Sequence, residues 1–298
     1  MDDHDWLAQR FETHRTHLRA VAYRMLGSIG EADDAVQEAW LRLSHSDTSG
    51  VQNLGGWLTT VVSRVCLDML RSRRSRRGAP LGEPKGGRVP DPVVGRPDGI
   101  DPEHEALLAD GVGLALLVVL ESLAPAERLA FVLHDMFAVP FAEIAPIVGR
   151  SPAAARQLAS RARRRVRGAA TSADAGLACQ RAAVDAFFAA SREGDFGALL
   201  AVLDPDVVLR IDGGALRAGL SRGVRGARAV AEQTFTFSRL SPFVRPALVN
   251  GAAGVVVAPR GRPFAVMGFT VRRGRIAEID VLADPERLRR LDLAVLDD

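Results

Sequence analysis

The spacing of apolar and polar positions predicts helices in the first part of the chain. From residue 6 to residue 77, apolar side chains recur every three or four positions in three runs, which is the period of an amphipathic helix. Residues 78–102 differ abruptly, with six glycines and six prolines in 25 positions, a composition that sustains neither a helix nor a central strand. We therefore expect a flexible linker there. A second helical block is predicted from about residue 103 to residue 170.

Beyond residue 176 the pattern changes from helical to mixed. Two helical runs precede DVVLRIDGG, which alternates with a period of two and ends in a Gly-Gly turn. A short helix and four further strand-like runs follow, with NG and RRGR as hairpin turns. The closing DPERLRRLDL has Asp284 as N-cap and Pro285 as the first helical residue. The sequence predicts a small α+β domain over residues 176–298.

Charge distribution changes this picture more than net charge does. The chain has 298 residues, a net charge of +3 and 39 basic residues, 38 of them arginine. The arginines gather in two clusters, at residues 64–77 and 156–167, and such local basic patches attract polyanions. The two cysteines, Cys66 and Cys179, indicate neither a disulfide framework nor a metal site. The acidic start and an apolar run of only ten residues at 111–120 predict no signal peptide and no membrane span, hence a cytoplasmic protein.

Residues 141–167 have the pattern of a helix-turn-helix. Two apolar-faced runs are separated by a three-residue turn, and the second begins with Ser151 as N-cap followed by Pro152. Its first residues would enter a major groove, where Arg156 suits guanine and Gln157 suits adenine. Further arginines would neutralise phosphates. The candidate DNA-binding residues are Ser151, Ala153, Ala154, Arg156, Gln157, Arg161 and Arg164. The alternative is an ordinary solvated helix; a membrane-surface helix is disfavoured because its apolar face is mostly alanine.

The amino-terminal block contains an acidic helix followed by a basic one. In EADDAVQEAWLRL the acids lie largely on one side and the apolar residues on the other, and the next helix ends in the arginines at 71–77. A nucleic acid can satisfy only the basic helix, so the acidic helix calls for a basic protein partner. The alternative is that these acids form an ordinary polar helix face.

Taken in order, EADDAVQEAWLRL, GGWLTTVVSRVCLDMLRSRR, the linker and SPAAARQLASRARRRV resemble regions two and four of an extracytoplasmic-function (ECF) sigma factor. The trailing DVVLRIDGG and DPERLRRL resemble the subgroup, including SigJ-type factors, with a C-terminal SnoaL-like extension of the nuclear-transport-factor-two-like fold. The resemblance implies two all-α sigma domains joined by a flexible linker and followed by an α+β domain. The expected boundaries are 1–77 for region two, 78–108 for the linker, 109–170 for region four and 176–298 for the SnoaL-like domain.

The resemblance also implies partners and roles. The chain would bind core RNA polymerase, through the β and β′ subunits, and promoter DNA in duplex and melted form. Polymerase-binding residues would be Asp33, Asp34, Gln37 and Glu38. The loop around residues 44–53 would accept a flipped base. Melting and DNA-binding residues would be Asn53, Trp57, Thr60, Arg64, Arg71, Arg73 and Arg74, with Trp57 offering an aromatic face to unpaired bases or serving as a core residue.

The C-terminal domain has two interpretations. In the first it regulates the sigma domains in cis, with an unidentified small molecule as a candidate ligand and the DPERLRRL helix as part of a switch. Subgroup linkers usually carry docking aromatics that RRGAPLGEP lacks, so looser docking is expected. In the second it is a pocket enzyme whose acid-base chemistry falls to carboxylates, although Asp212 fits a turn equally well and Glu278 and Asp280 could share an exposed strand face. The candidate residues for pocket or switch are Arg210, Asp212, Glu278, Asp280 and Asp284.

We expect a sigma factor without catalytic residues, metal or cofactor. A ligand-sensing helix-turn-helix repressor would ordinarily need a dimer to match two half-sites. An enzyme would not need the arginine clusters. Only the sigma factor interpretation uses the acidic helix, both arginine clusters and the linker together.

Overall fold

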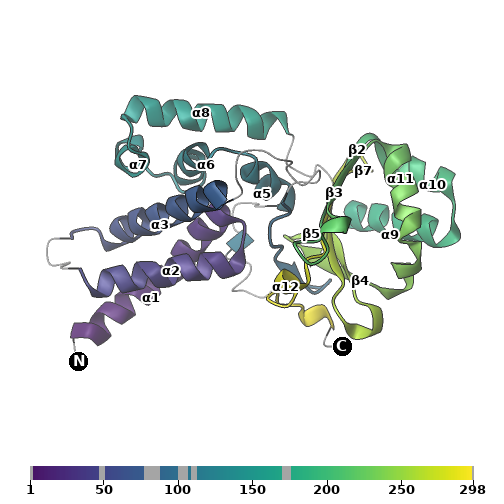
Figure 1. The fold of residues 1–298 in the computed structure, drawn as a ribbon, viewed down its shortest axis with the longest axis horizontal. Helices are drawn as coiled ribbons and strands as arrows, with labels where there is room; N and C mark the ends of the chain where they lie inside the picture. The colour runs from purple at the N-terminus through teal and green to yellow at the C-terminus, as the bar shows by residue number, and fades with distance from the viewer. Residues whose placement is uncertain are drawn as a thin grey trace. The chain divides into compact units, whose positions relative to one another are not determined.

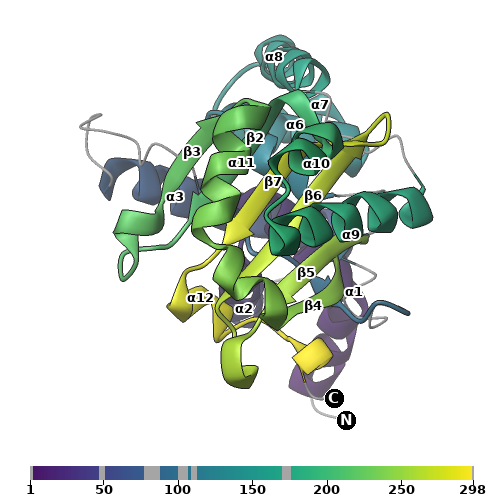
Figure 2. The same ribbon diagram turned by 90° about the vertical axis from the view of Figure 1, so that its right-hand side faces the viewer.

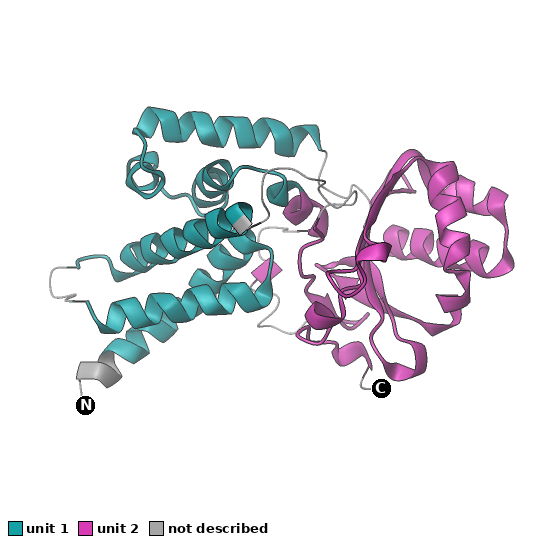
Figure 3. Cartoon of the chain, viewed as in Figure 1, with its two compact units in different colours: residues 1–81, 119–170 teal, residues 82–118, 171–298 magenta. Residues whose placement is uncertain are grey.

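The computed structural model describes residues 3–46, 51–76, 88–99, 107–108, 113–169 and 176–296. They belong to two compact units (Figure 3). Unit 1 comprises residues 1–81 and 119–170, and unit 2 comprises residues 82–118 and 171–298. The described linker residues 88–99 and the helical residues 114–118 therefore group with the C-terminal domain, whereas the boundaries expected from sequence place them in a separate linker and in region four.

Three helices form the first part of unit 1, as the apolar spacing predicts (Figure 1). They are α1 (Asp3–Leu26), α2 (Ile29–Ser44) and α3 (Leu54–Arg76). Ser28 begins α2 by accepting a hydrogen bond from the Glu31 backbone N–H at 3.5 Å, and Asn53 caps α3 by accepting from Gly56 N–H at 3.0 Å. The helices pack on each other through fully buried side chains, among them Leu18, Val21, Leu43, Leu58 and Val62.

The second part of unit 1 contains α6 (Pro125–Phe131), a π-helical turn (Val132–Met136), α7 (Phe141–Val148) and α8 (Pro152–Gly168). The short helix α5 (Leu114–Glu121) precedes them. Between α7 and α8, Gly149 has a φ of 66°, a left-handed conformation that glycine adopts without steric cost. The Ser151 hydroxyl accepts a hydrogen bond from Ala154 N–H at 3.2 Å. The helix-turn-helix and its cap lie where the sequence predicts them.

Two arginines bind the last carbonyls of α1, Arg128 from the second helical part of unit 1 and Arg73 from α3. Arg128, only 2% exposed, donates from Nη1 to the Met25 carbonyl at 2.8 Å. Arg73 donates from both Nη1 and Nη2 to the Leu26 carbonyl at 3.2 Å. The last carbonyls of a helix have no partner within it and lie at the negative end of its dipole, so α1 ends on two guanidinium groups from distant helices.

Unit 2 is built on a seven-stranded sheet in the order β1-β4-β5-β6-β7-β2-β3 (Figure 2). The strands are β1 (Val94–Gly95), β2 (Leu203–Asp212), β3 (Arg222–Arg225), β4 (Val244–Val249), β5 (Ala252–Val257), β6 (Ala265–Arg272) and β7 (Arg275–Leu282). The hairpin turns at Asn250-Gly251 and Arg273-Gly274 have positive φ at both central residues, the signature of type I′ turns. The predicted NG and RRGR hairpins are confirmed.

Two features of the sheet were not visible in the sequence. Strand β2 pairs in parallel with β7, and Arg210 lies opposite Asp280, 70 residues away in the sequence. Strand β3 is short and polar, pairing with β2 from Val208↔Arg225 to Ile211↔Arg222. The pairing of β2 with β7 depends on partners that are remote in sequence.

Each face of the sheet carries a buried apolar cluster. One face packs against α9 (Leu177–Glu193), α10 (Phe196–Val202) and α11 (Ala227–Thr236) around a core that includes Phe187, Phe188 and Phe269. Figure 2 shows these helices in front of the strands. The other face carries Val249, Val256, Val266 and Leu282, clustered with Val89, Val94, Leu114 and Leu288.

Part of the predicted linker belongs to this second face. Residues 88–99, which the sequence assigns to a flexible coil, include β1, an antiparallel edge strand beside β4. Val93 N–H donates to the Asn250 side-chain oxygen at 3.1 Å, and Asn250 N–H donates to the Val93 carbonyl at 2.8 Å. Val89 is fully buried. Valines between the prolines supply apolar surface, and an edge position tolerates proline, so the segment docks on the sheet.

Candidate functional site

The outer face of α2 presents the predicted acidic residues to solvent. Asp33, Asp34 and Gln37 are exposed, while the opposite face of α2 is buried. Asp33 pairs with Arg19 at 2.6 Å, and Glu38 pairs with Arg42 at 2.9 Å. Leu41 lies one turn farther along the acidic face and is 46% exposed. The structure thus adds an exposed leucine that the sequence analysis missed, although its spacing from Asp34 and Gln37 could have shown it.

The predicted melting residues share one side of α3. Trp57, Thr60 and Arg64 follow at spacings of three and four residues, which places them on one helix face. Trp57 is half-buried and Arg64 is exposed. Two of the predicted melting residues form hydrogen bonds within their own helix. Asn53 caps α3, and the Thr60 hydroxyl donates to the Gly56 carbonyl at 3.0 Å. Residues 47–50 of the loop expected to accept a flipped base lie outside the described residues.

The arginines at the end of α3 divide into two kinds. Arg71 and Arg74 are exposed. Arg73 turns inward: its side chain is 13% exposed and it forms ion pairs with Glu31 and, at 3.8 Å, with Glu121. In this structure Arg73 therefore holds α1, α2 and α5 together, whereas Arg71 and Arg74 remain accessible to a polyanion.

The exposed surface of α8 is divided along its length. Near its start Ala153, Arg156 and Gln157 are exposed, and the Arg156 guanidinium lies 5.5 Å from the centre of the Phe141 ring. Farther along, Arg161 and Arg165 pair with Glu127 at 3.8 and 3.1 Å, and Arg163 pairs with Asp135 at 2.6 Å. Arg164 is exposed.

Two of the proposed recognition residues have local roles in α8. The Ser151 hydroxyl serves as the N-cap, and Ala154 is half-buried. Arg156 and Gln157 are thus the polar side chains that the first turns of α8 hold out to solvent.

A buried charge cluster lies on β2 and β7. Arg210 Nη1 donates to Glu278 Oε2 at 2.8 Å and to Asp280 Oδ1 at 2.9 Å, and Arg272 Nη2 donates to Glu278 Oε1 at 2.7 Å. Asp280 is 2% exposed and Glu278 is 9% exposed, so the alternative of an exposed strand face does not hold. Burial raises the pKa of Asp280 to about 6, against the opposing attraction of Arg210.

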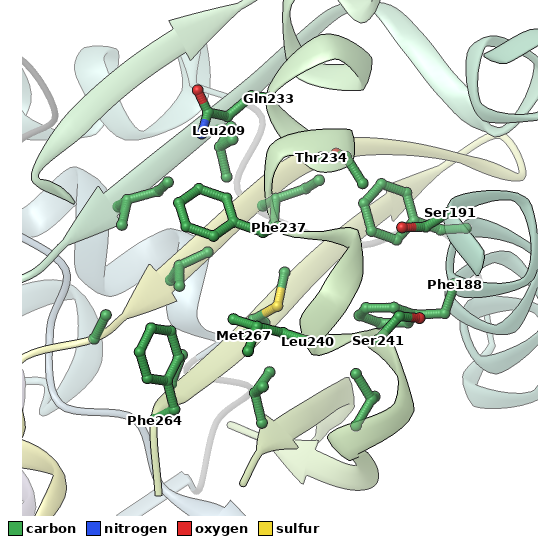
Figure 4. A pocket seen from close by; sticks show the side chains of 18 of the residues that line it. Phe188, Ser191, Leu209, Gln233, Thr234, Phe237, Leu240, Ser241, Phe264 and Met267 are labelled. Carbon is green, nitrogen blue, oxygen red and sulfur yellow. The ribbon is translucent and has the colours of Figure 1, made fainter. Parts of the chain in front are cut away.

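The opposite face of the same strands lines an apolar cavity of about 100 Å³ (Figure 4). Leu209 and Ile211 from β2 and Ile279 and Val281 from β7 point into it. Because side chains alternate along a strand, Arg210, Glu278 and Asp280 face away from the cavity. Among the side chains that line it, none is an aspartate, glutamate, histidine, lysine or cysteine. The carboxylates on which the enzyme alternative depends are therefore not in the cavity.

A second network, which we call the linker clamp, consists of Asp91, Asp212, Arg287 and the backbone of Val89. Asp212 Oδ2 accepts from Val89 N–H at 3.1 Å and from Arg287 Nη1 at 2.8 Å. Arg287 Nε donates to Asp91 Oδ1 at 2.5 Å, and Nη2 donates to the Val89 carbonyl at 2.5 Å. Asp212 is thus a linker ligand as well as a turn residue. Asp91 and Arg287 have no local signal in the sequence, because their pairing spans 196 residues.

Two further residues position the clamp. Asp284 caps α12 (Pro285–Leu288), accepting from Glu286 N–H at 2.9 Å, which confirms the predicted cap and orients Arg287. Gly214 has a φ of 61°, and a Cβ there would lie 2.1 Å from Asp284 Oδ2. Only glycine fits at that position.

The described part of the chain has three further properties, which concern metal ligands, membrane-spanning helices and cysteines. It contains no group of three or more histidine, cysteine or acidic side chains placed to hold a metal ion. None of its helices has the length and apolar character to cross a membrane. Cys66 is buried, which raises the pKa of its thiol, and Cys179 is exposed.

Comparisons with known proteins agree with these surfaces. Residues 10–76 match the family model of Sigma-70 region 2, and residues 113–166 match that of Sigma-70, region 4. Together they define a sigma factor whose acidic α2 lies in region 2 and whose helix-turn-helix lies in region 4.

Full-length relatives narrow the class. The chain is 40% identical to the ECF RNA polymerase sigma factor SigJ of Mycobacterium tuberculosis, covering 93% of this chain and 91% of SigJ. It is 36% identical to the probable ECF RNA polymerase sigma factor SigI of the same species, over 97% of both chains. The crystal structure of SigJ matches with a TM-score of 0.76 and 36% identity, covering 96% of this chain and 99% of that one. The chain belongs to the ECF RNA polymerase sigma factors, and directs transcription as an alternative sigma factor that carries a C-terminal α+β domain.

Proposed function

We propose that the outer face of α2 is the surface that binds core RNA polymerase in the cytoplasm, through its β and β′ subunits. Asp34 and Gln37 are exposed beside Leu41, so the face combines negative charge with one apolar contact. Protein interfaces typically combine an apolar centre with a polar rim, and this face has both kinds of side chain. Asp33 and Glu38 already have arginine partners and would exchange them on binding.

Promoter DNA would contact α3 and α8. The α3 face with Trp57, Thr60 and Arg64 would hold the melting strand, and Arg71 and Arg74 would approach its phosphates. On α8, Arg156 and Gln157 would read base edges in the duplex, and Arg164 would contact phosphate. The arginines paired with Glu127 and Asp135 would chiefly hold α8 on its support.

The C-terminal domain would modulate the sigma regions in cis by holding the linker between them. The observation that carries this proposal is the linker clamp. In it, Asp212 accepts from the Val89 N–H, and Arg287 donates to the Val89 carbonyl and to the Asp91 carboxylate. An extended linker of 25 residues could span roughly 80 Å. With Val89 held, only the 13 steps from Arg76 to Val89 connect region 2 to the clamp, a reach of about 45 Å. Clamping therefore shortens the tether that separates the two promoter-binding regions.

Run-off transcription with purified core polymerase tests this proposal. The full chain, Arg287→Ala and a truncation after residue 170 would be compared on a promoter library. The point variant is the sharper test, because truncation also uncovers the apolar linker residues Val89 and Val94. We expect promoter-specific transcripts from the full chain and a changed yield from Arg287→Ala. Equal yields from all three proteins would exclude modulation in cis.

A further inference from the structure

The cavity in unit 2 is lined by side chains from both layers of the domain. Strands β2, β6 and β7 form its floor, α9 contributes Phe188 and Ser191, and α11 with the 3-10 turn after it contributes Gln233, Phe237 and Ser241. In Figure 4 these side chains converge on one space, with Gln233 at one end and Ser241 toward the other. Most of the lining is aromatic or aliphatic.

Two polar atoms in this lining are buried without a hydrogen-bond partner. They are Nε2 of Gln233 and the hydroxyl oxygen of Ser241, a residue 6% exposed. The amide of Gln233 is oriented by Arg222, whose Nη1 lies 3.0 Å from Gln233 Oε1. A guanidinium group only donates hydrogen bonds, so the oxygen must face Arg222 and the NH₂ group is left facing away from it.

Leaving such groups unsatisfied in an apolar site is costly, since each loses its hydrogen bonds to water. A ligand that supplies the missing acceptor would remove that cost. We propose that this cavity binds a small, uncharged, mainly apolar molecule, aromatic or alicyclic, that carries a carbonyl or similar acceptor oxygen for Gln233 Nε2 or the Ser241 hydroxyl.

Charge and size narrow the ligand class. No charged side chain lines the cavity, and a buried charge without a partner is strongly disfavoured. The volume of about 100 Å³ is smaller than the roughly 150 Å³ of an engineered cavity that binds benzene, which limits the ligand to one ring with at most a short substituent. An occupant would contact Ile211, whose neighbour Asp212 belongs to the linker clamp.

Matched probes test the site in the full chain. Acetophenone has the required ring and carbonyl, α-methylstyrene has the same shape without the acceptor, and benzoate adds a charge. Binding can be followed through ¹³C-methyl methionine spectra, because Met267 lines the cavity. We expect the Met267 signal to respond to acetophenone, with an affinity roughly three- to tenfold above that of α-methylstyrene, and not to respond to benzoate.

Variants separate the polar contact from the cavity itself. Ser241→Ala and Gln233→Leu should each reduce the preference for acetophenone, and together they should abolish it. Leu240→Trp should fill the cavity and prevent binding of both neutral probes. The control is Leu216→Trp, at a 65% exposed position of the same domain that does not line the cavity. Failure of both neutral probes to bind, equal binding of the two by the unsubstituted chain, or binding of benzoate would overturn the proposal.

Discussion

Asp212 and Arg287 lie 75 residues apart in the sequence, and their side chains are joined at 2.8 Å between Oδ2 and Nη1. Each also binds the linker, Asp212 through Val89 N–H and Arg287 through Asp91 and the Val89 carbonyl. Both side chains are about seven-eighths buried, at 13% and 15% exposure. Charge-assisted hydrogen bonds in such a setting are stronger than neutral ones, so the pair holds the linker against the sheet.

Arg287→Ala should release residues 88–95 from the sheet. The substitution removes the contacts to Asp91, Asp212 and the Val89 carbonyl, and leaves the Asp212 to Val89 bond alone. We expect amide hydrogen exchange in this segment to accelerate at least about tenfold, because local opening then costs less free energy.

The control for the clamp is Arg290→Ala, which changes an exposed arginine of the same segment and should leave exchange at residues 88–95 unchanged. Unaltered exchange in Arg287→Ala would show that β1 pairing and Val89 burial suffice to hold the linker.

Arg156→Ala should weaken recognition of the upstream promoter element and relax its sequence preference. Arg156 is exposed near the start of α8, where a side chain reaches base edges, and a bidentate contact to guanine contributes about 1–3 kcal/mol. Arg164→Ala should instead weaken binding evenly across sequences and lower the salt slope by about one. Binding of the holoenzyme to promoter variants at several salt concentrations distinguishes the two; identical behaviour would argue against base reading by Arg156.

Asp34→Lys and Leu41→Ala should each reduce affinity for core polymerase by roughly tenfold. The first reverses the charge that a basic partner surface would attract, and the second removes the exposed apolar contact. Glu143→Lys is a matched control, because Glu143 is exposed on α7, away from α2. Competition with a labelled sigma factor for core polymerase measures the affinity. If Glu143→Lys lowered the affinity as much as Asp34→Lys, the effect would come from net charge and not from this face of α2.

The pH dependence of stability should carry a contribution from Asp280. Burial raises its pKa from 3.8 to about 6 in the folded chain, so between pH 4 and 6 the folded state binds more protons than the unfolded state. The contribution of Asp280 to the free energy of unfolding therefore falls as pH rises through that window, and it is constant above the window. Thermal unfolding of the full chain and of Asp280→Asn from pH 4.5 to 8 should differ in slope only below about pH 6. Asp292→Asn, at an exposed position, should reproduce the slope of the unsubstituted chain.

Arg128→Leu should destabilise unit 1 by about 3 kcal/mol or more. The guanidinium is buried, bonds the Met25 carbonyl and pairs with Glu121 at 3.3 Å. Its removal leaves the Met25 carbonyl without this donor and Glu121 with the more distant Arg73, at 3.8 Å. Urea unfolding followed by tryptophan fluorescence measures the loss, because all three tryptophans lie in residues 1–81. A midpoint unchanged from that of the unsubstituted chain would mean that apolar packing alone holds the two helical parts together.

The sequence by itself determined the elements and their order. Apolar spacing located α1, α2, α3 and the helix-turn-helix, and Asn250-Gly251 and Asp284-Pro285 located a hairpin and a helix start, because caps and turns depend on residues a few positions apart. The exposed faces of α2 and α8 followed from the same short-range periodicity.

Only the tertiary structure decided which of these residues meet. Arg73 was expected at DNA but lies in an ion-pair network, Asp280 is buried rather than exposed, and residues 88–99 dock instead of forming a free coil. The clamp of Asp91, Asp212 and Arg287 likewise joins three distant segments. Such pairings depend on long-range sheet register and on burial, which local periodicity does not encode; the cavity exists for the same reason, because its walls come from strands and helices that only the folded domain brings together.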